Sequence, residues 1–160
     1  SMTEIDQYQY RYKVTLTWLN MPSKRSYDII GLGFQQAYVQ LNSSINFQQN
    51  YTFSSGSSYS SVVCVPQQFD TGISAVFLLP SGSLNALSSY LYYNVRKVDD
   101  DYTVTYMEAG GDYSHATSSS SETNAQRHSV NHVTGIELDS AIDDKYDSIN
   151  VARAIWYGEW

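Results

Sequence analysis

Residues 8–18 read Tyr-Gln-Tyr-Arg-Tyr-Lys-Val-Thr-Leu-Thr-Trp, and this stretch decides the fold. Its aromatic and aliphatic side chains occupy every second position, with polar side chains between them. Successive side chains of a β-strand point to opposite faces, so the pattern predicts a long strand with one apolar and one polar face. An aromatic face this broad has to be covered by a second layer. The stretch therefore predicts a sheet packed on another sheet.

Segments with strand-like patterns recur along the rest of the chain. They cover residues 26–33, 34–41, 45–53, 62–66, 73–79, 102–106, 130–138 and 149–157. Turn residues separate them about every eight to twelve positions, a spacing typical of all-β sandwiches. We therefore predict an all-β fold, an antiparallel β-sandwich of jelly-roll or Greek-key type with about nine or ten strands. The length of 160 residues predicts a single domain, residues 1–160.

At most one short helix is expected. Leu84, Leu87 and Leu91 are three and four positions apart and follow Ser83, a residue that can cap a helix. The alternative is that a strand already covers residues 90–98. The sequence leaves both interpretations open.

Two stretches rich in Ser and Gly predict loops. Residues 54–61 surround Tyr59, and residues 109–129 contain Tyr113, His115 and four consecutive serines. A loop of about twenty residues is uncommon in a compact domain and is usually either functional or disordered. Residues 1–7 are expected to be a flexible arm that begins with a Ser left from tag removal.

The charge balance excludes two classes of partner. The net charge is −7 and the pI is near 4.7, and the nine Lys and Arg residues form no cluster in the sequence. Binding to a phosphate backbone or to an anionic membrane surface needs clustered basic side chains. No stretch is long and apolar enough to span a bilayer, so neither a nucleic acid nor membrane insertion is predicted.

No metal site or cofactor is predicted. His128 and His132 are four positions apart, but in a strand that spacing separates them by about 13 Å, too far for one metal ion. The Asp residues at 99–101 and 139–147 lack the order of a calcium loop and are expected to be solvated turns. Cys64, the only cysteine, lies in an apolar run and is expected to be a core residue.

Enzymatic activity is not expected. The chain carries no phosphate-binding loop, dinucleotide fingerprint or zinc-protease motif. Glu108 and Glu137 could form a glycosidase pair, since that reaction needs two carboxylates at a set separation. Pairs of this kind occur in any acidic chain, so a glycoside hydrolase is the third hypothesis.

The leading hypothesis is a non-enzymatic recognition domain. Tyr provides a rigid amphipathic contact surface, and small polar residues adapt their hydrogen bonds to a ligand. Tyr occurs 15 times here, and Tyr59, Tyr113 and His115 lie on the two expected loops. Aromatic rings beside amides also suit sugars. These three residues are therefore predicted to contact a cell-surface glycan or a protein receptor.

In composition, the chain resembles the Ser-, Thr-, Asn- and Tyr-rich β heads of viral and phage fibres. The resemblance implies a homotrimer at a virion surface or outside the cell, with Trp156 and Trp160 seated in a subunit interface. It transfers no functional residues. The second hypothesis is a structural assembly component of a virion, a baseplate or a surface layer.

Overall fold

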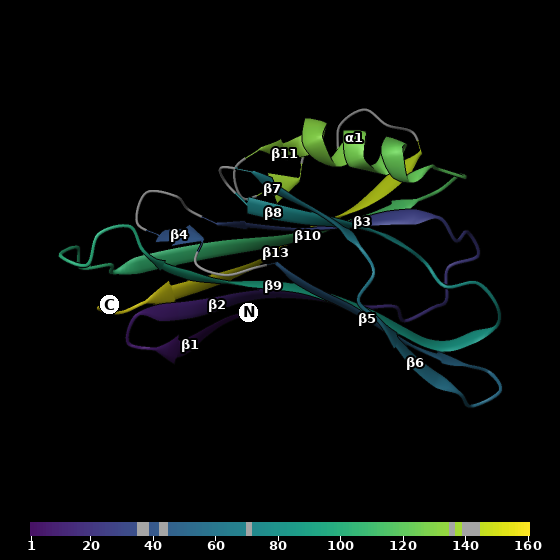
Figure 1. Ribbon diagram of the computed structural model, residues 1–160, viewed down its shortest axis with the longest axis horizontal. Coiled ribbons are helices and arrows are strands. Elements are labelled where there is room, and N and C mark those ends of the chain that lie inside the picture. Colours follow the sequence, from purple (N-terminus) through teal and green to yellow (C-terminus); the bar gives the residue numbers. More distant parts are fainter. Residues whose placement is uncertain (35–38, 42–44, 70–71, 135–136, 139–144) are drawn as a thin grey trace.

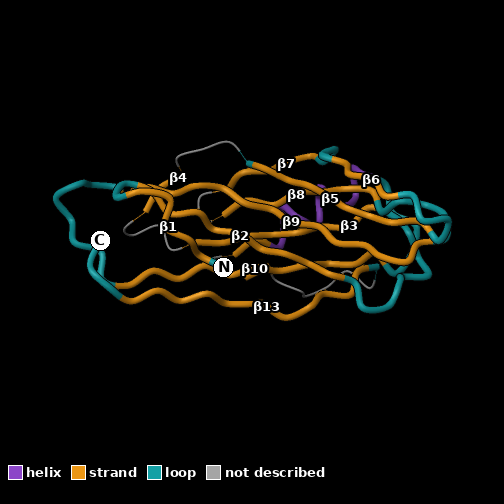
Figure 2. Tube along the Cα trace, turned by 90° about the horizontal axis from the view of Figure 1, so that it is seen from below, coloured by secondary structure: helices purple, strands orange, loops and turns teal. Residues whose placement is uncertain are grey.

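The computed structural model describes residues 1–34, 39–41, 45–69, 72–134, 137–138 and 145–160. Two antiparallel sheets, one of six strands and one of five, pack face to face as a β-sandwich (Figure 1). The strands run along the long axis, and the loops gather at the two ends (Figure 2). The predicted all-β antiparallel sandwich is confirmed, with eleven strands in the two sheets. None of the helices in the described part is long and apolar enough to cross a membrane.

The first sheet has the strand order β1-β2-β9-β5-β6, and β4 pairs with the far end of β9. Its strands are β1 (Met2–Asp6), β2 (Gln9–Thr17), β4 (Val39–Leu41), β5 (Asn46–Phe53), β6 (Ser58–Ser61) and β9 (Leu84–Lys97). Residues 2–6 therefore form an edge strand, not the flexible arm that the sequence predicted. They pair with β2, so their backbone is hydrogen-bonded to the sheet.

The second sheet has the strand order β13-β10-β3-β8-β7. Its strands are β3 (Tyr27–Phe34), β7 (Val65–Phe69), β8 (Gly72–Leu78), β10 (Tyr106–Ala116) and β13 (Tyr146–Tyr157). The helix α1 (Glu122–His132) covers the outer face of this sheet (Figure 1), where Ala125 packs against Ile29 and Val76. A short pair, β11 (Val133–Thr134) and β12 (Glu137–Leu138), lies outside both sheets.

The strand β2 behaves as its alternating sequence predicts. Tyr10 and Tyr12 are buried between the sheets, whereas Arg11 and Lys13 lie on the outer face. Tyr10 contacts the rings of Trp156 and Trp160 edge-on, at 5.5 and 4.8 Å between centroids. The C-terminal aromatic side chains thus pack within this chain. That packing removes the main reason to expect a trimer interface there.

The helix expected at Leu84–Leu91 is absent, and the alternative, a strand, is correct. The strand β9 has a buried side chain at every second residue from Leu87 to Val95. An irregularity in the pairing at Thr52/Phe53 places Leu84 opposite Phe53 and shifts it out of this alternation. Because of this shift, the buried residues Leu84 and Leu87 are three positions apart, a spacing that is also typical of a helix.

The long loop expected at residues 109–129 is also wrong. Residues 106–116 are strand β10, which pairs with β3 on one side and β13 on the other, and residues 122–132 are helix. Glycines in this strand serve a close approach of the two sheets. A Cβ added to Gly111 would lie 2.5 Å from Cγ2 of Val14 in the opposite sheet. Only residues 117–121 remain as a connection.

Three further boundaries differ from the sequence prediction. Residues 58–61 form β6, an edge strand of the first sheet. Residues 62–64 are not a strand, and β7, an edge strand of the second sheet, begins at Val65. The expected strand at residues 102–106 begins only at Tyr106, and the one at 130–138 is replaced by the end of α1 and the pair β11–β12. Edge strands have only one neighbour, so their sequences carry weaker hydrophobic patterns.

Candidate functional site

Tyr113 and His115 do not lie on a loop. Both belong to β10, and Tyr113 is only 3% exposed, so it cannot form part of a contact surface. Burial, together with the charge of Asp28, raises the pKa of the Tyr113 hydroxyl. The misplacement has a physical cause: glycine and serine are common in loops, but here they let two sheets approach closely.

The two residues instead enclose a buried carboxylate. Asp28, fully buried on β3, accepts hydrogen bonds from the Tyr113 hydroxyl and from the backbone N–H of Ala116 at 2.9 Å. The His115 Nδ1 lies 3.0 Å from Asp28 Oδ2, and the ring of Trp18 packs edge-on against both aromatic rings. The cluster connects β3 to β10 and has the role of a structural network.

Tyr59 lies at the surface, as predicted, although on β6 and not in a loop. Its side chain is 52% exposed. The ring stacks on Tyr51 with 5.8 Å between centroids and 21° between planes, and contacts Phe53 edge-on at 5.5 Å. Tyr59 also lines an open groove of about 550 Å³ at this end of the first sheet.

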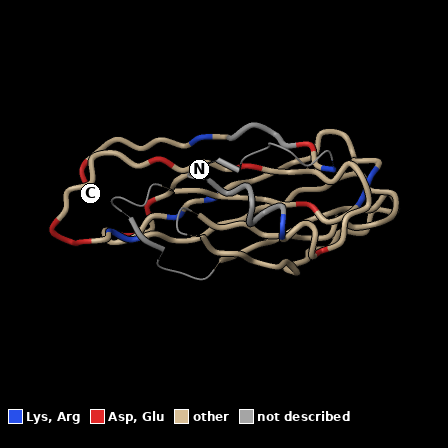
Figure 3. The backbone as a smooth tube through the Cα atoms, turned by 90° about the horizontal axis from the view of Figure 1, so that it is seen from above, with Lys and Arg blue, Asp and Glu red and all other residues tan. Residues whose placement is uncertain are grey.

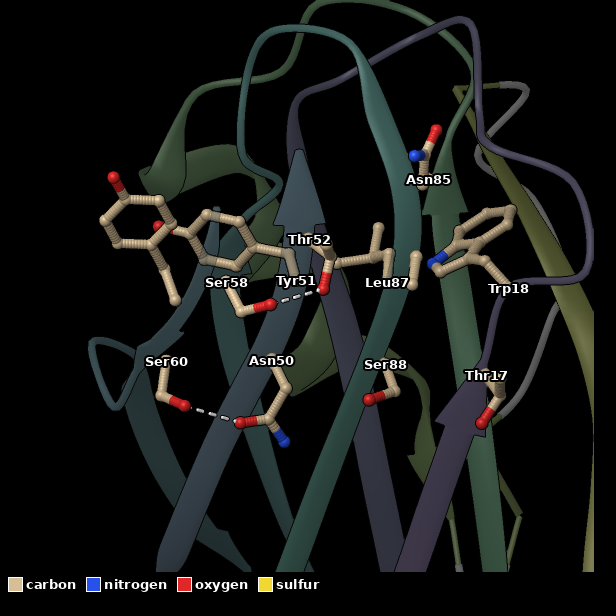
Figure 4. Close-up of a pocket in the computed structure, with 12 residues that line it drawn as sticks. Thr17, Trp18, Asn50, Tyr51, Thr52, Ser58, Ser60, Asn85, Leu87 and Ser88 are labelled. Carbon is tan, nitrogen blue, oxygen red and sulfur yellow. Dashed lines mark hydrogen bonds between the residues drawn. The ribbon is translucent and has the colours of Figure 1, made fainter. Parts of the chain in front are cut away.

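The groove is lined by residues of β2, β5, β6 and β9 and by Trp18, which directly follows β2 (Figure 4). They are Thr17, Trp18, Asn50, Tyr51, Thr52, Ser58, Tyr59, Ser60, Asn85, Ala86, Leu87 and Ser88. Seven of these are Ser, Thr or Asn, three are aromatic and none is charged. Although the chain has a net charge of −7, the groove lining contains no carboxylate and no basic side chain.

Strand register places the polar residues in rows on the outward face. Ser88 is paired with Thr17 on one side and Asn50 on the other, and Asn50 is paired with Ser60. The next row contains Thr52 and Ser58, whose hydroxyls are 2.9 Å apart (Figure 4). Residues directly opposite each other in paired strands place their side chains on the same face, so the hydroxyls and amides form a continuous surface.

The side-chain amides of Asn50 and Asn85 are oriented by hydrogen bonds that their oxygens accept. Asn50 Oδ1 accepts from the Ser60 hydroxyl at 2.7 Å and from Gln48 Nε2 at 2.6 Å, and Asn85 Oδ1 accepts from the Ser54 hydroxyl at 3.0 Å. Among the described residues, neither Asn50 Nδ2 nor Asn85 Nδ2 has a hydrogen-bond acceptor. Both N–H₂ groups therefore remain available as donors with a fixed orientation.

Beyond the groove, the same face carries two cation–aromatic pairs. The Arg11 guanidinium lies 4.5 Å from the centre of the Tyr92 ring, and Lys13 Nζ lies 4.0 Å from that of Tyr90. Within the described chain, neither cation forms a salt bridge with a carboxylate. Charged residues are otherwise sparse and scattered along the chain (Figure 3).

Glu108, one carboxylate of the glycosidase pair that the sequence suggested, has two side-chain partners in the structure. Glu108 on β10 forms a salt bridge with Arg153 at 3.2 Å and accepts a hydrogen bond from the Tyr106 hydroxyl, which raises the pKa of Tyr106. The side chain of its expected partner, Glu137, lies outside the described residues. Glu108 therefore has a structural partner on each carboxylate oxygen.

The expected absence of a metal site is tested only in part. In the described part of the chain, no group of three His, Cys, Asp or Glu side chains could hold a metal ion. His128 and His132 lie on helix α1, not on the expected strand, and their side chains are outside the described residues. Residues 99–101 form an exposed turn and Asp147 is exposed, whereas residues 139–144 are outside the described part.

Cys64 is not the core residue that its apolar neighbours suggested. It lies in the connection between β6 and β7, where Val62 and Val63 are 69% and 79% exposed. Cys64 itself is half-buried at the edge of the core, and burial raises the pKa of its thiol. The apolar run follows the surface of the sandwich from one sheet to the other.

Comparison with known proteins gives little further information. No protein-family model matches the chain, and no curated protein matches it. Among solved structures, the chain is similar to the pilus 2b backbone protein of group B streptococcus, with 12% identity and a TM-score of 0.47. The similarity covers 74% of this chain and 52% of that protein, so the chain spans about half of the pilus protein's length.

The sequence analysis missed Asn50, Asn85 and Trp18 as lining residues of the groove. A signal for Asn50 exists, because residues 45–53 alternate and place Asn50 and Thr52 on the polar face. A row of amides and hydroxyls across several strands depends on register, which a single sequence does not specify. Asn85 and Trp18 lie where a strand begins or ends, and such boundaries are the least predictable part of an element.

Proposed function

We propose that the protein is a non-enzymatic recognition domain that binds an uncharged glycan in the groove between Trp18 and Tyr59. The observation that carries this proposal is the composition of the lining, which is rich in hydroxyls, amides and aromatic rings and contains no charge. Sugar rings have apolar C–H faces and a rim of hydroxyls. They can stack on a Tyr ring while their hydroxyls pair with amides and hydroxyls.

The groove supports binding more than catalysis. Hydrolysis of a glycosidic bond needs two carboxyl groups on either side of the bond, and the groove lining contains none. The fixed N–H₂ groups of Asn50 and Asn85 can donate to sugar hydroxyls without reorganisation. Such preorganisation increases affinity because little ordering is needed on binding.

The proposal is tested on an array of neutral and acidic glycans with the wild-type chain and two tyrosine variants. Tyr59→Ala removes an exposed ring of the groove, and the matched control Tyr102→Ala removes a similarly exposed ring, 58% accessible, outside it. We expect the wild type and Tyr102→Ala to retain the same neutral glycans. Tyr59→Ala should bind them about fivefold more weakly, since a ring contact contributes about 1 kcal/mol. Equal retention by Tyr59→Ala would remove the groove from consideration.

The absence of enzymatic activity is tested with the retained glycan as substrate. We expect no release of reducing ends by the wild type. Turnover that disappears in Glu108→Gln would contradict the proposal and favour the glycoside hydrolase hypothesis. Turnover that persists in this variant would still contradict a non-enzymatic role.

The second hypothesis, a role in assembly, is favoured by a separate observation. The side chains of Val62, Val63 and Leu78 are more than half exposed, although large apolar side chains are usually covered. Light scattering on the eluting peak distinguishes the expected states. A mass three times 18.1 kDa would favour the trimeric fibre head, and a monomer would leave these side chains for another partner.

A further inference from the structure

A second cleft opens between the two sheets, on the side where their edge strands lie. It has a volume of about 550 Å³ and lies where β5 and β6 diverge from the second sheet (Figure 1). Its walls include Phe53, Val63, Cys64, Val65, Phe77 and Leu79. Arg25, Ser61, Ser81 and Glu122 also line the cleft, but most of its walls are apolar, in contrast to the mostly polar lining of the groove.

The strand β8 has a free backbone edge at this cleft. Its register with β7 ends at the Val65–Val76 pair, whereas its register with β3 continues to the Tyr27–Leu78 pair. The Leu79 N–H donates to the Ser26 carbonyl. Because backbone groups alternate sides in an antiparallel ladder, the N–H and C=O of Leu78 point away from β3. No strand of the described chain pairs with Leu78 on that side.

A buried amide without a partner lines the same cleft. Gln49 is 3% exposed, and among the described residues its Nε2 has no hydrogen-bond acceptor. Ser89, directly opposite Gln49 on β9, likewise has a buried hydroxyl that no described residue pairs with. A buried polar group without a hydrogen bond costs about 1–3 kcal/mol, so such groups usually have a partner in the functional state.

Several exposed side chains at the rim of the cleft are apolar. Val63 is 79% exposed and Leu78 is 54% exposed, and both line the cleft. Val62, just outside it, is 69% exposed. An extended segment that adds to a free strand edge needs backbone partners together with pockets for alternate side chains. The cleft provides both.

We propose that this cleft binds an extended apolar segment of a partner protein, which pairs with the free edge of β8 at Leu78. The segment places an apolar side chain between Phe53 and Phe77, and one of its backbone carbonyls accepts from Gln49 Nε2. A small apolar molecule would satisfy the walls but leave the Leu78 backbone unpaired. The free strand edge therefore favours a peptide.

The test distinguishes the contribution of the Leu78 backbone to peptide binding from that of its side chain. Leu78→Pro removes the N–H that faces the cleft, a change that is tolerated where this N–H has no ladder partner, and Leu78→Ala retains that N–H. The probe is a displayed library of random decapeptides, followed by titration of the best binder as a synthetic peptide. We expect Leu78→Pro to weaken binding at least tenfold, and Leu78→Ala to weaken it less. No binder from the library, or equal binding by Leu78→Pro, would overturn the proposal.

Two measurements keep the test decisive if Leu78→Pro does not fold. Amide hydrogen exchange in the wild type should slow at least tenfold at Leu78 when the peptide is saturating, and should stay unchanged at Ser88. Binding that leaves the exchange of Leu78 unchanged would overturn strand addition. A chain that dimerises without peptide and already protects the Leu78 amide would identify a second copy as the occupant, and would also overturn the proposal. Neither result depends on glycan binding.

Discussion

The two candidate sites differ in polarity although one strand contributes to both. Along β5, Asn50 and Thr52 line the groove, whereas Gln49 and Phe53 line the cleft between the sheets. Only Tyr51 borders both. The alternation of side chains in a strand separates the two sets, so neighbouring residues face environments of opposite character.

The difference shows how one part of a sandwich can present two surfaces of opposite polarity, with Tyr51 at their border. The groove offers donors and acceptors at fixed positions on a sheet whose outer face no described helix or strand covers. The cleft offers apolar walls and a free strand edge. A substitution on one face of β5 should therefore leave the other site unchanged, and this expectation can be tested residue by residue.

The largest effect is expected from Asp28→Ala, which should destabilise the sandwich and thereby weaken both sites. The change leaves the Tyr113 hydroxyl, His115 and the Ala116 N–H without their buried acceptor. Removal of one member of a buried charged network costs about 3–5 kcal/mol. Denaturant unfolding measures the loss, with the exposed Asp147→Ala as control within about 0.5 kcal/mol. Equal stability of the two variants would contradict a structural role for the cluster.

Asn50→Ala should separate the two sites. It removes the fixed N–H₂ donor of the groove, and a hydrogen bond of about 1 kcal/mol corresponds to a loss of about fivefold in glycan affinity. Affinity for the peptide in the cleft should stay within twofold, as measured by titration of both ligands. A parallel loss of both affinities would show that the sites are coupled.

Gln49→Met changes the cleft side of β5 and should stabilise the free protein. The variant replaces a buried amide that lacks a hydrogen-bond acceptor by an apolar side chain of similar length, so the free protein should become about 1 kcal/mol more stable. Gln48→Met is the matched control, because Gln48 bonds to Asn50 and Tyr90 and should lose stability. A Gln49→Met variant that is less stable than the wild type would show that the amide already has a partner.

The smallest effect is expected in the reactivity of Cys64. Burial raises its pKa, so little thiolate is present near neutral pH and labelling by a maleimide should still accelerate above pH 9. Because Cys64 lines the cleft, the bound peptide should slow labelling severalfold, whereas the glycan should not. The labelling rate is measured by mass spectrometry. A rate that reaches a plateau near pH 7 would contradict the raised pKa.

Much of the architecture could be predicted from the sequence. The alternation in residues 8–18 indicates a long strand with one buried face, and β2 has this arrangement. The segment predicted at residues 45–53 likewise corresponds to β5, Asn46–Phe53. Such segments are predictable because one face is buried and the other solvated, which leaves a pattern with a period of two.

The errors occurred where composition and spacing had more than one physical cause. Gly110 and Gly111 indicated a loop, but both lie in β10, where Gly111 permits the approach of Val14 from the other sheet. Leu84 and Leu87 indicated a helix, but their spacing reflects an irregular strand pairing. Tyr59 was placed correctly at the surface because its neighbours are small and polar. The cleft was not predictable, since it depends on where β7 stops pairing with β8.

The central claim is that the uncharged groove, and not the apolar cleft, is the glycan site. Amide chemical shifts recorded during titration with a neutral glycan retained on the array test it most directly. The account predicts shifts at Asn50, Ser60 and Ser88, with Leu78 and Cys64 unchanged. Shifts confined to Leu78 and Cys64, or none at the groove on saturation, would contradict it.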